Sequence, residues 1–249
     1  MMRLTVFWVL LLFVSPVTGF VHGAVGGKVP KWSFSGIMGK VDKPAVQRGY
    51  QVYKEVCASC HSMKRIAFRN LREIGFTEAE VKALAASYTY TDGPDENGDM
   101  FERPGIPSDY FPNPFPNRES AAASNNGAFP PDLSLITKAR HNGPDYVYRL
   151  MTGYESTEPD ESGLYANPFF PAGKIAMAPP LSKGLVSYMD DTEPTIENMA
   201  RDVVNFLQWA AEPEMESRKK LGIKVVMSLT AGTILVIFVN RRLWSTLKK

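Results

Sequence analysis

Five consecutive residues, Cys57-Ala58-Ser59-Cys60-His61, constrain the fold of this chain more than any other feature. The C-x-x-C-H spacing is the attachment signature of a c-type haem. Two thiols one helical turn apart can reach both vinyl groups of one porphyrin, and the adjacent imidazole then comes under the iron as the proximal ligand. The motif therefore predicts one covalent haem on Cys57, Cys60 and His61, filling a domain whose own protein core is modest.

Two other interpretations of the motif are weaker. A structural zinc site normally has four ligands, so Cys57, Cys60 and His61 would need His141 as the fourth, and two ligands would be neighbours in sequence. A thioredoxin-like thiol pair follows a strand of a parallel sheet, and the sequence indicates neither feature. The chain has two cysteines in all, which excludes a disulfide framework. The sequence therefore favours haem.

The second axial ligand is less constrained. Met177 lies far along the chain from the motif, has small neighbours and precedes the Pro179-Pro180 pair, so its thioether has room to approach an iron. Ligation by His61 and Met177 raises the haem potential and favours electron transfer over gas binding. The alternative is that Met177 is ordinary core filler. The competing ligands are Met100, Met151, Met189, Met199 and His141.

A haem also needs partners for its two propionates and walls around its ring. Arg140 is the cation that we expect to be buried or half-buried, which suits a propionate. Asn125, Tyr146 and the Pro130-Pro131 pair are candidates for the haem surround. The alternatives are a surface position for Arg140 and simple loop geometry for the prolines.

The N-terminal stretch predicts export. Arg3 precedes an apolar run over residues 6–17, and the small residues Gly23 and Ala24 permit cleavage nearby. We therefore expect a signal peptide over residues 1–24, with a retained N-terminal anchor as the alternative. Either form places the following domain on the outer side of the membrane.

The C-terminal stretch predicts a membrane anchor. Residues 221–240 are apolar apart from Lys224, and at about 1.5 Å per residue they reach about 30 Å, the thickness of a hydrocarbon core. Basic residues flank this span on both sides. The expected organisation is a periplasmic haem domain over residues 25–213, followed by an anchor helix and a short basic cytoplasmic tail over residues 214–249.

Charge is unevenly distributed along the chain. Residues 92–193 contain 16 Asp and Glu against 7 Lys and Arg, a local balance of −9, although the whole chain carries a net charge of +2. This asymmetry indicates either a surface for a charged partner or simply a well-solvated face. Nucleic acid is not an expected partner, because the basic residues do not cluster with aromatic residues on a folded segment.

The soluble part reads as short helices joined by long loops. Asp42, Thr77 and Thr195 are predicted N-caps, and the Pro- and Gly-rich residues 88–131 and 154–187 are predicted loops. One predicted helix begins near residue 43 and runs into the motif. Four further helices are predicted over residues 77–86, 132–141, 145–151 and 195–210. The expected fold is mainly α, a class I-like cytochrome c domain with long loops plus one C-terminal transmembrane helix.

Several stretches together resemble the cytochrome c1 family, the haem subunit of the ubiquinol–cytochrome c reductase or cytochrome bc1 complex. The resemblance covers nearly the whole mature chain and is more specific than the haem motif. The stretches that carry it are residues 49–53 (GYQVY), the motif itself, 125–134 (NNGAFPPDLS), 139–141 (ARH), 177–181 (MAPPL) and 206–213 (FLQWAAEP).

The resemblance implies the roles of the site residues. Met177 would be the sixth iron ligand, Arg140 would meet a propionate, and Asn125, Pro131 and Tyr146 would border the haem. Some bacterial relatives carry an extra disulfide, which this chain cannot form. The short leader is of the bacterial kind and implies a single-pass protein of the bacterial inner membrane.

The resemblance also implies the partners. Such a subunit belongs to a dimeric multi-subunit complex with cytochrome b, takes electrons from the Rieske iron–sulfur protein and passes them to a soluble or tethered cytochrome c. It serves as the electron-transfer subunit of an oxidoreductase and has no bond-making chemistry of its own. The alternatives are an anchored cytochrome that feeds a terminal oxidase and, in another class, a haem sensor or peroxidase.

Overall fold

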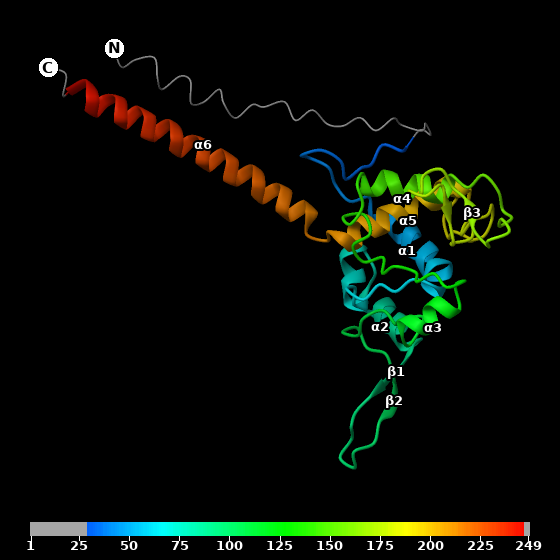
Figure 1. The fold of residues 1–249 in the computed structure, drawn as a ribbon. Coiled ribbons are helices and arrows are strands. Elements are labelled where there is room, and N and C mark those ends of the chain that lie inside the picture. The colour runs from blue at the N-terminus through cyan, green and yellow to red at the C-terminus, as the bar shows by residue number, and fades with distance from the viewer. Residues whose placement is uncertain (1–28, 247–249) are drawn as a thin grey trace.

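Two helices that are far apart in the sequence form the centre of the folded domain. The computed structural model describes residues 29–246, and in it α1 (Lys43–Glu55) packs along α5 (Ile196–Ala211). Helix α4 (Gly143–Thr152) packs on α5, so three helices make one layer (Figure 1). The predicted signal peptide, residues 1–24, lies outside the described residues.

The other elements are short, with the exception of the last helix. One 3-10 helix lies within the motif and a second follows it, and each of the two small antiparallel sheets has two strands. In chain order these elements are η1 (Cys57–Ser59), η2 (Phe68–Ile74), α2 (Glu78–Ala86), β1 (Thr89–Asp92), β2 (Phe101–Pro104), α3 (Arg118–Ala123), β3 (Tyr165–Ala166), β4 (Lys174–Ile175) and α6 (Met215–Thr246).

The crossing of α1 and α5 depends on a glycine. A Cβ atom at Gly49 would lie 1.9 Å from the carbonyl oxygen of Asp202, so no larger residue fits between the two backbones. The rings of Tyr50 and Tyr53 pack on Phe206 with centroid distances of 5.6 and 5.5 Å. These contacts make the α1–α5 pair the rigid support from which the haem motif emerges.

Three of the predicted helix starts are confirmed. The Asp42 carboxylate accepts from the Ala45 amide at 3.3 Å, and the Thr195 hydroxyl accepts from the Asn198 amide at 3.1 Å. Thr77 and Glu80 form the predicted capping box at the start of α2. Helix α1 also runs directly into the motif as expected, and the mainly helical fold class is confirmed.

Several local predictions are wrong. Residues 132–141 form a series of turns instead of a helix, and Gly143 and Pro144, predicted to separate two helices, lie in the first turn of α4. The predicted loop over residues 88–131 contains the β1–β2 hairpin and α3, and the predicted loop over residues 154–187 contains β3 and β4. The hairpin register pairs Thr89 with Pro104 and Asp92 with Phe101.

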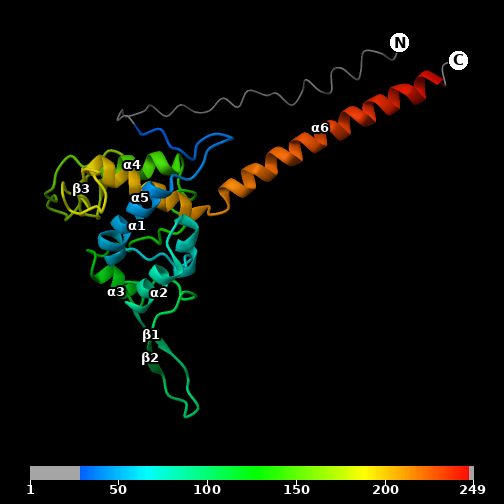
Figure 2. The ribbon, with the colours of Figure 1, turned by 180° about the vertical axis from the view of Figure 1, so that it is seen from behind.

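Helix α6 leaves the domain as an isolated rod (Figures 1 and 2). It contains the predicted apolar span, and within the described residues it is the one helix that is long and apolar enough to cross a membrane. Its most apolar window has a mean hydropathy of 2.1, and none of that window is buried inside the protein. A soluble core helix would be buried, so α6 has the properties of a membrane anchor.

Candidate haem site

The haem motif forms a tight turn at the end of α1. The amides of Cys60 and His61 both donate to the carbonyl oxygen of Cys57, at 3.1 and 2.9 Å. Because residues three apart in a 3-10 turn lie on the same side, this conformation brings the Cys57 and Cys60 side chains to one side of the turn. The backbone therefore already has the shape that attachment to two vinyl groups of one porphyrin requires.

The imidazole of His61 is held in one tautomer. Its Nδ1 atom lies 2.8 Å from the carbonyl oxygen of Pro131, and a carbonyl can only accept, so Nδ1 carries the hydrogen. Burial lowers the pKa of His61 and favours the neutral ring, although the Pro131 carbonyl and Asp132 act in the opposite direction. Nε2 therefore keeps its lone pair, which is the state that a haem iron requires of its proximal ligand.

Asp132 ties the segment that carries Pro131 to the segment that carries His61. Its Oδ2 atom accepts from the Ser62 hydroxyl at 2.8 Å and from the Lys64 amide at 2.9 Å. Its Oδ1 atom accepts from the Ser134 amide at 2.9 Å. The Leu133 amide also donates to the carbonyl oxygen of Ser62 at 2.9 Å. We call residues 131–134 the proximal strap, because they fix the histidine from behind.

The pKa of Asp132 reflects this role. Burial acts to raise it, but hydrogen bonds from Ser134, the Lys64 amide and Ser62 act in the opposite direction and outweigh burial, so the pKa lies below its ordinary value. The carboxylate is therefore charged at neutral pH.

Sequence reasoning missed Ser62, Asp132 and Ser134 as site residues. The Asp-x-Ser pattern after two prolines, typical of an Asx turn, is the signal that could have indicated them.

Met177 lies two residues after β4, in the second long loop. It is half-buried, and its carbonyl oxygen accepts from the Tyr154 hydroxyl at 2.9 Å. The competing methionines are either in the core or in solvent: Met151 and Met199 are buried, whereas Met100 and Met189 are exposed. An axial thioether must be available to the haem yet shielded from water. Among these methionines, Met177 has that intermediate burial.

The other predicted surround residues differ in their environment. Arg140 was expected to be buried or half-buried and is instead exposed, because the turns of residues 134–141 leave it at the surface, where its Nη1 donates to the Ala139 carbonyl at 3.1 Å. Asn125 is half-buried, with its Nδ2 donating to the Ala121 carbonyl at 2.7 Å. Tyr146 is half-buried on α4 and packs against the core.

The structure disfavours the two alternative uses of the motif. Within residues 29–246, no group of three or more His, Cys, Asp or Glu side chains could hold a metal ion, so His141 does not complete a zinc site with Cys57 and Cys60. Burial, followed by the neighbouring Cys60, raises the pKa of the Cys57 thiol to about 12. Thiol–disulfide exchange needs a lowered thiol pKa, which is the opposite shift.

A cavity of about 260 Å³ adjoins the motif at Ala58 and Ser59. Ala58 and Ser59 contribute to its wall, together with the rings of Tyr53, Phe68 and Phe111. Neither His61 nor Met177 lines it, so it lies beside the motif and not between the two proposed iron ligands. The donor set fits a covalent haem on other grounds: two thiols one turn apart, an imidazole with a free Nε2, and a half-buried thioether.

Comparison with known proteins finds matches over most of the chain. Residues 32–247 match the Cytochrome C1 family. The chain is 46% identical over 246 residues to cytochrome c1 of Rhodospirillum rubrum, covering 91% of this chain and 90% of the relative. It is 49% identical over 230 residues to the mitochondrial heme protein cytochrome c1-2 of Solanum tuberosum, covering 91% and 88%. A protein of Bradyrhizobium diazoefficiens named cytochrome b/c1 is 47% identical over 240 residues, covering 86% of this chain and 35% of that protein.

Proposed function

The chain belongs to the cytochrome c1 family, and from this membership we propose that it is the haem subunit of a ubiquinol–cytochrome c reductase, the cytochrome bc1 complex. Haem c bound covalently through cysteines is the cofactor of this family, and the chain has two cysteines, Cys57 and Cys60. In the proposed role the protein accepts one electron at a time from the Rieske iron–sulfur protein and passes it to a soluble or tethered cytochrome c.

Each site residue has a proposed task. Cys57 and Cys60 hold the haem as thioethers, His61 is the proximal iron ligand and Met177 is the sixth ligand. When bound, the haem supplies a one-electron couple whose potential His/Met ligation raises. With His61 and Met177 as its two axial ligands, the iron would have no open position for small gases. In the same proposal Arg140 meets a propionate, and Asn125, Pro131 and Tyr146 border the ring.

The observation that carries this proposal is the hydrogen bond between His61 Nδ1 and the Pro131 carbonyl at 2.8 Å. A bond at Nδ1 orients the ring and leaves Nε2 as the ligand atom. A thiol oxidoreductase would have no use for a histidine oriented in this way. The raised pKa of Cys57 is further support, because thiol–disulfide exchange is favoured by a lowered thiol pKa.

The proposed electron acceptor is a basic cytochrome c. Support comes from the local charge of −9 over residues 92–193 and from the exposure of its acidic groups. Asp95, Glu96 and Asp99 are exposed in the loop of the β1–β2 hairpin, and Asp191 and Glu193 are exposed before α5. Such a surface speeds encounter with a positively charged partner, and the rate falls as salt is added.

The proposed location is the bacterial inner membrane, with the haem domain over residues 25–213 on the periplasmic side and the basic tail inside. Helix α6, unburied and apolar, supports the membrane anchor. The relative named cytochrome b/c1 supports cytochrome b as a companion subunit. A dimeric assembly, the signal peptide over residues 1–24 and the Rieske protein as electron donor belong to the same proposal.

The test is purification in a mild detergent from membranes of the native organism. We expect the chain to retain a haem stain on a denaturing gel and to copurify with a b-type cytochrome and an iron–sulfur protein. The purified assembly should reduce cytochrome c when given a quinol. Copurification with terminal oxidase subunits alone would contradict the assignment and favour a cytochrome that feeds an oxidase.

A further inference from the structure

A tight turn before α1 holds two large apolar side chains in solvent. Ile37 is 74% exposed and Met38 is 75% exposed. They occupy the central positions of a turn over residues 36–39, in which the Gly39 amide donates to the Gly36 carbonyl at 3.4 Å and Gly36 has a φ of +73°. Gly, Pro, Asn, Asp and Ser normally fill such positions, so two adjacent large apolar residues indicate apolar surroundings.

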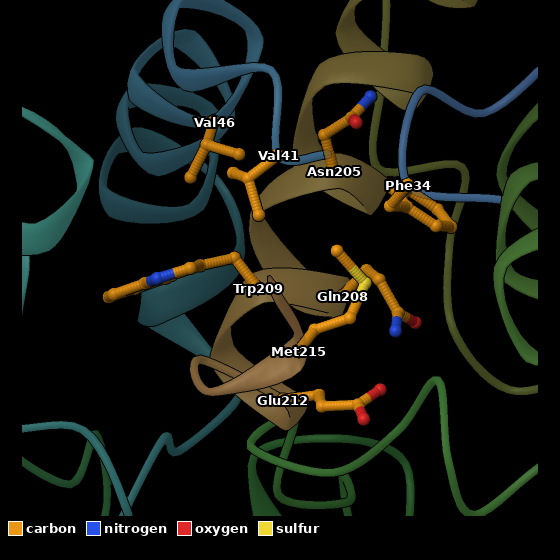
Figure 3. Close-up of a pocket in the computed structure, with 8 residues that line it drawn as sticks. All are labelled: Phe34, Val41, Val46, Asn205, Gln208, Trp209, Glu212 and Met215. Atoms are coloured by element: carbon orange, nitrogen blue, oxygen red, sulfur yellow. The ribbon is translucent and has the colours of Figure 1, made fainter. Parts of the chain in front are cut away.

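The base of this 36–39 turn is firmly attached to the domain. Trp32 Nε1 donates to Asp145 Oδ1 on α4 at 2.5 Å, and the Trp32 ring stacks on Phe34 at 5.4 Å. The Lys40 amide donates to the Ser33 carbonyl at 2.9 Å and closes the neck of the loop. Phe34 itself is buried and lines a cleft with Trp209 and residues around it (Figure 3). The exposure of Ile37 and Met38 is therefore a fixed feature of the fold.

The turn is also bound to the first part of α6. Lys219 Nζ donates to the carbonyl oxygens of Phe34 at 2.6 Å and Gly39 at 3.5 Å. The Val41 amide donates to Glu216 Oε1 at 2.9 Å. The apolar span begins at Leu221, two residues after Lys219, which is a rise of about 3 Å along the helix. The turn is thus held at the height where α6 enters the membrane.

The ribbon views agree with this placement. In Figures 1 and 2 the blue segment before α1 leaves the domain on the side from which α6 emerges, and the β1–β2 hairpin projects from the opposite end. Lys31 and Lys40 are exposed beside the turn, and Arg218 and Lys220 are exposed on α6. Apolar side chains surrounded by basic groups are typical of segments that lie in the interface of an anionic membrane.

We propose that the 36–39 turn inserts Ile37 and Met38 into the lipid interface of the leaflet on the haem-domain side. This inference rests on the proposed membrane span of α6 and goes beyond it. A single helix lets a domain tilt and rotate, whereas a second contact beside the helix restricts the tilt. The turn would therefore fix the height and orientation of the haem domain above the membrane.

The experiment uses a spin label at Met38. Because haem attachment consumes Cys57 and Cys60, a cysteine introduced elsewhere is the one reactive thiol of the haem-loaded chain. The full-length Met38→Cys chain is labelled with a nitroxide and placed alone in nanodiscs of phosphatidylcholine and phosphatidylglycerol. The readout is the ratio of label collisions with oxygen, which concentrates in lipid, to collisions with a water-soluble nickel chelate.

Two further labels are the controls. Met100→Cys replaces another exposed methionine, 60% exposed beside the β1–β2 hairpin at the far end of the domain. Leu229→Cys lies within α6 and reports on the span itself. Ile37→Cys provides an independent measurement at the adjacent position if Met38→Cys accumulates poorly.

We expect the oxygen-to-nickel ratio at Met38 to be several-fold higher than at Met100 and to approach that at Leu229. A ratio at Met38 equal to that at Met100, with Leu229 still in lipid, would overturn the membrane contact while leaving the anchor intact. A label at Met38 that becomes shielded only when companion subunits are present would also overturn it and indicate a protein contact. Water exposure at Leu229 would instead contradict the proposed span.

Discussion

The two sides of the proposed haem site are built differently. On the His61 side, the proximal strap is joined to the haem motif by the Pro131, Asp132 and Leu133 hydrogen bonds, across about 70 residues of sequence. On the other side, Met177 lies in a long loop, and the hydrogen bond described for it comes from the Tyr154 hydroxyl to its carbonyl oxygen. The histidine is thus set in place by the protein, whereas the proposed methionine ligand would depend more on its own bond to the iron.

The largest effect, on haem content, is expected from replacing His61 on the proximal side. In His61→Leu the strap loses the group it orients and the haem would lose its proposed proximal ligand, so little haem-loaded protein should accumulate. The measurement is haem stain per unit of protein on a denaturing gel. Undiminished haem stain in this variant would show that the histidine is not part of the site.

Met177→Leu should have a smaller effect. Leucine conserves the volume, so haem stain should persist, but the iron gains an open position and carbon monoxide should bind to the reduced protein. The reduction potential should fall by on the order of 0.1 V or more, within the roughly 0.8 V that axial ligands span. An unchanged potential without carbon monoxide binding would exclude Met177 and return the role to one of its competitors.

The strap itself can be tested with Asp132→Ala. This change leaves the Ser62 hydroxyl and the Lys64 and Ser134 amides without their acceptor, which should lower the free energy of unfolding by about 1–3 kcal/mol. Urea unfolding of the haem-loaded protein is the measurement. The matched control is Glu96→Ala in the exposed hairpin loop, for which we expect a change within about 0.5 kcal/mol. Equal effects of the two variants would argue against a strap.

Acid should reduce the contribution of Asp132 to the free energy of unfolding. The folded-state pKa of Asp132 is lowered, so its contribution to stability is present above its unfolded pKa and is lost as the pH falls through the folded value. The difference in unfolding free energy between wild type and Asp132→Asn should therefore shrink on acidification from pH 7. A difference that grows on acidification would mean that the carboxylate is not stabilised in the folded state.

Tyr154→Phe should produce the smallest effect. It removes one hydroxyl that donates to the Met177 carbonyl, a loss of about 0.5–1.5 kcal/mol in unfolding free energy. Because the proposed bond from Met177 to the iron would also hold the loop, we expect haem content to be unchanged and the potential to shift less than in Met177→Leu. A potential as low as that of Met177→Leu would show that Tyr154 controls ligation, and the contrast between the two sides would then be smaller than proposed.

The difference between the two sides also explains what could be predicted from the sequence. Local signals were sufficient for the haem motif and for the helices capped by Asp42, Thr77 and Thr195, because each cap bonds to an amide three residues away. The strap was not predictable in this way. Residues 132–141 read as a helix, but Asp132 and Leu133 bond to residues 62–64 instead, and no periodicity records such long-range bonds.

The β1–β2 hairpin was missed for a related reason. Its strands give little apolar signal, because Tyr90 is the single apolar side chain of β1 and the β2 pattern does not alternate, although Tyr90 packs against the core. Ion pairs help to hold it: Arg103 Nε donates to Asp92 at 2.6 Å and its Nη1 donates to Asp109 at 2.7 Å. The position of the 36–39 turn could not be predicted from the sequence either. It depends on a long-range hydrogen bond, from Lys219 of α6 to the carbonyl oxygen of Phe34.

Mass spectrometry of the purified chain tests the central claim most directly. The protein is denatured, treated with a thiol-alkylating reagent and digested, and the peptide that contains residues 57–61 is identified. The expected result is one peptide with the added mass of a single haem and no alkylated cysteine. Recovery of that peptide with two alkylated thiols and no haem would contradict the account of this protein as a haem-based electron carrier.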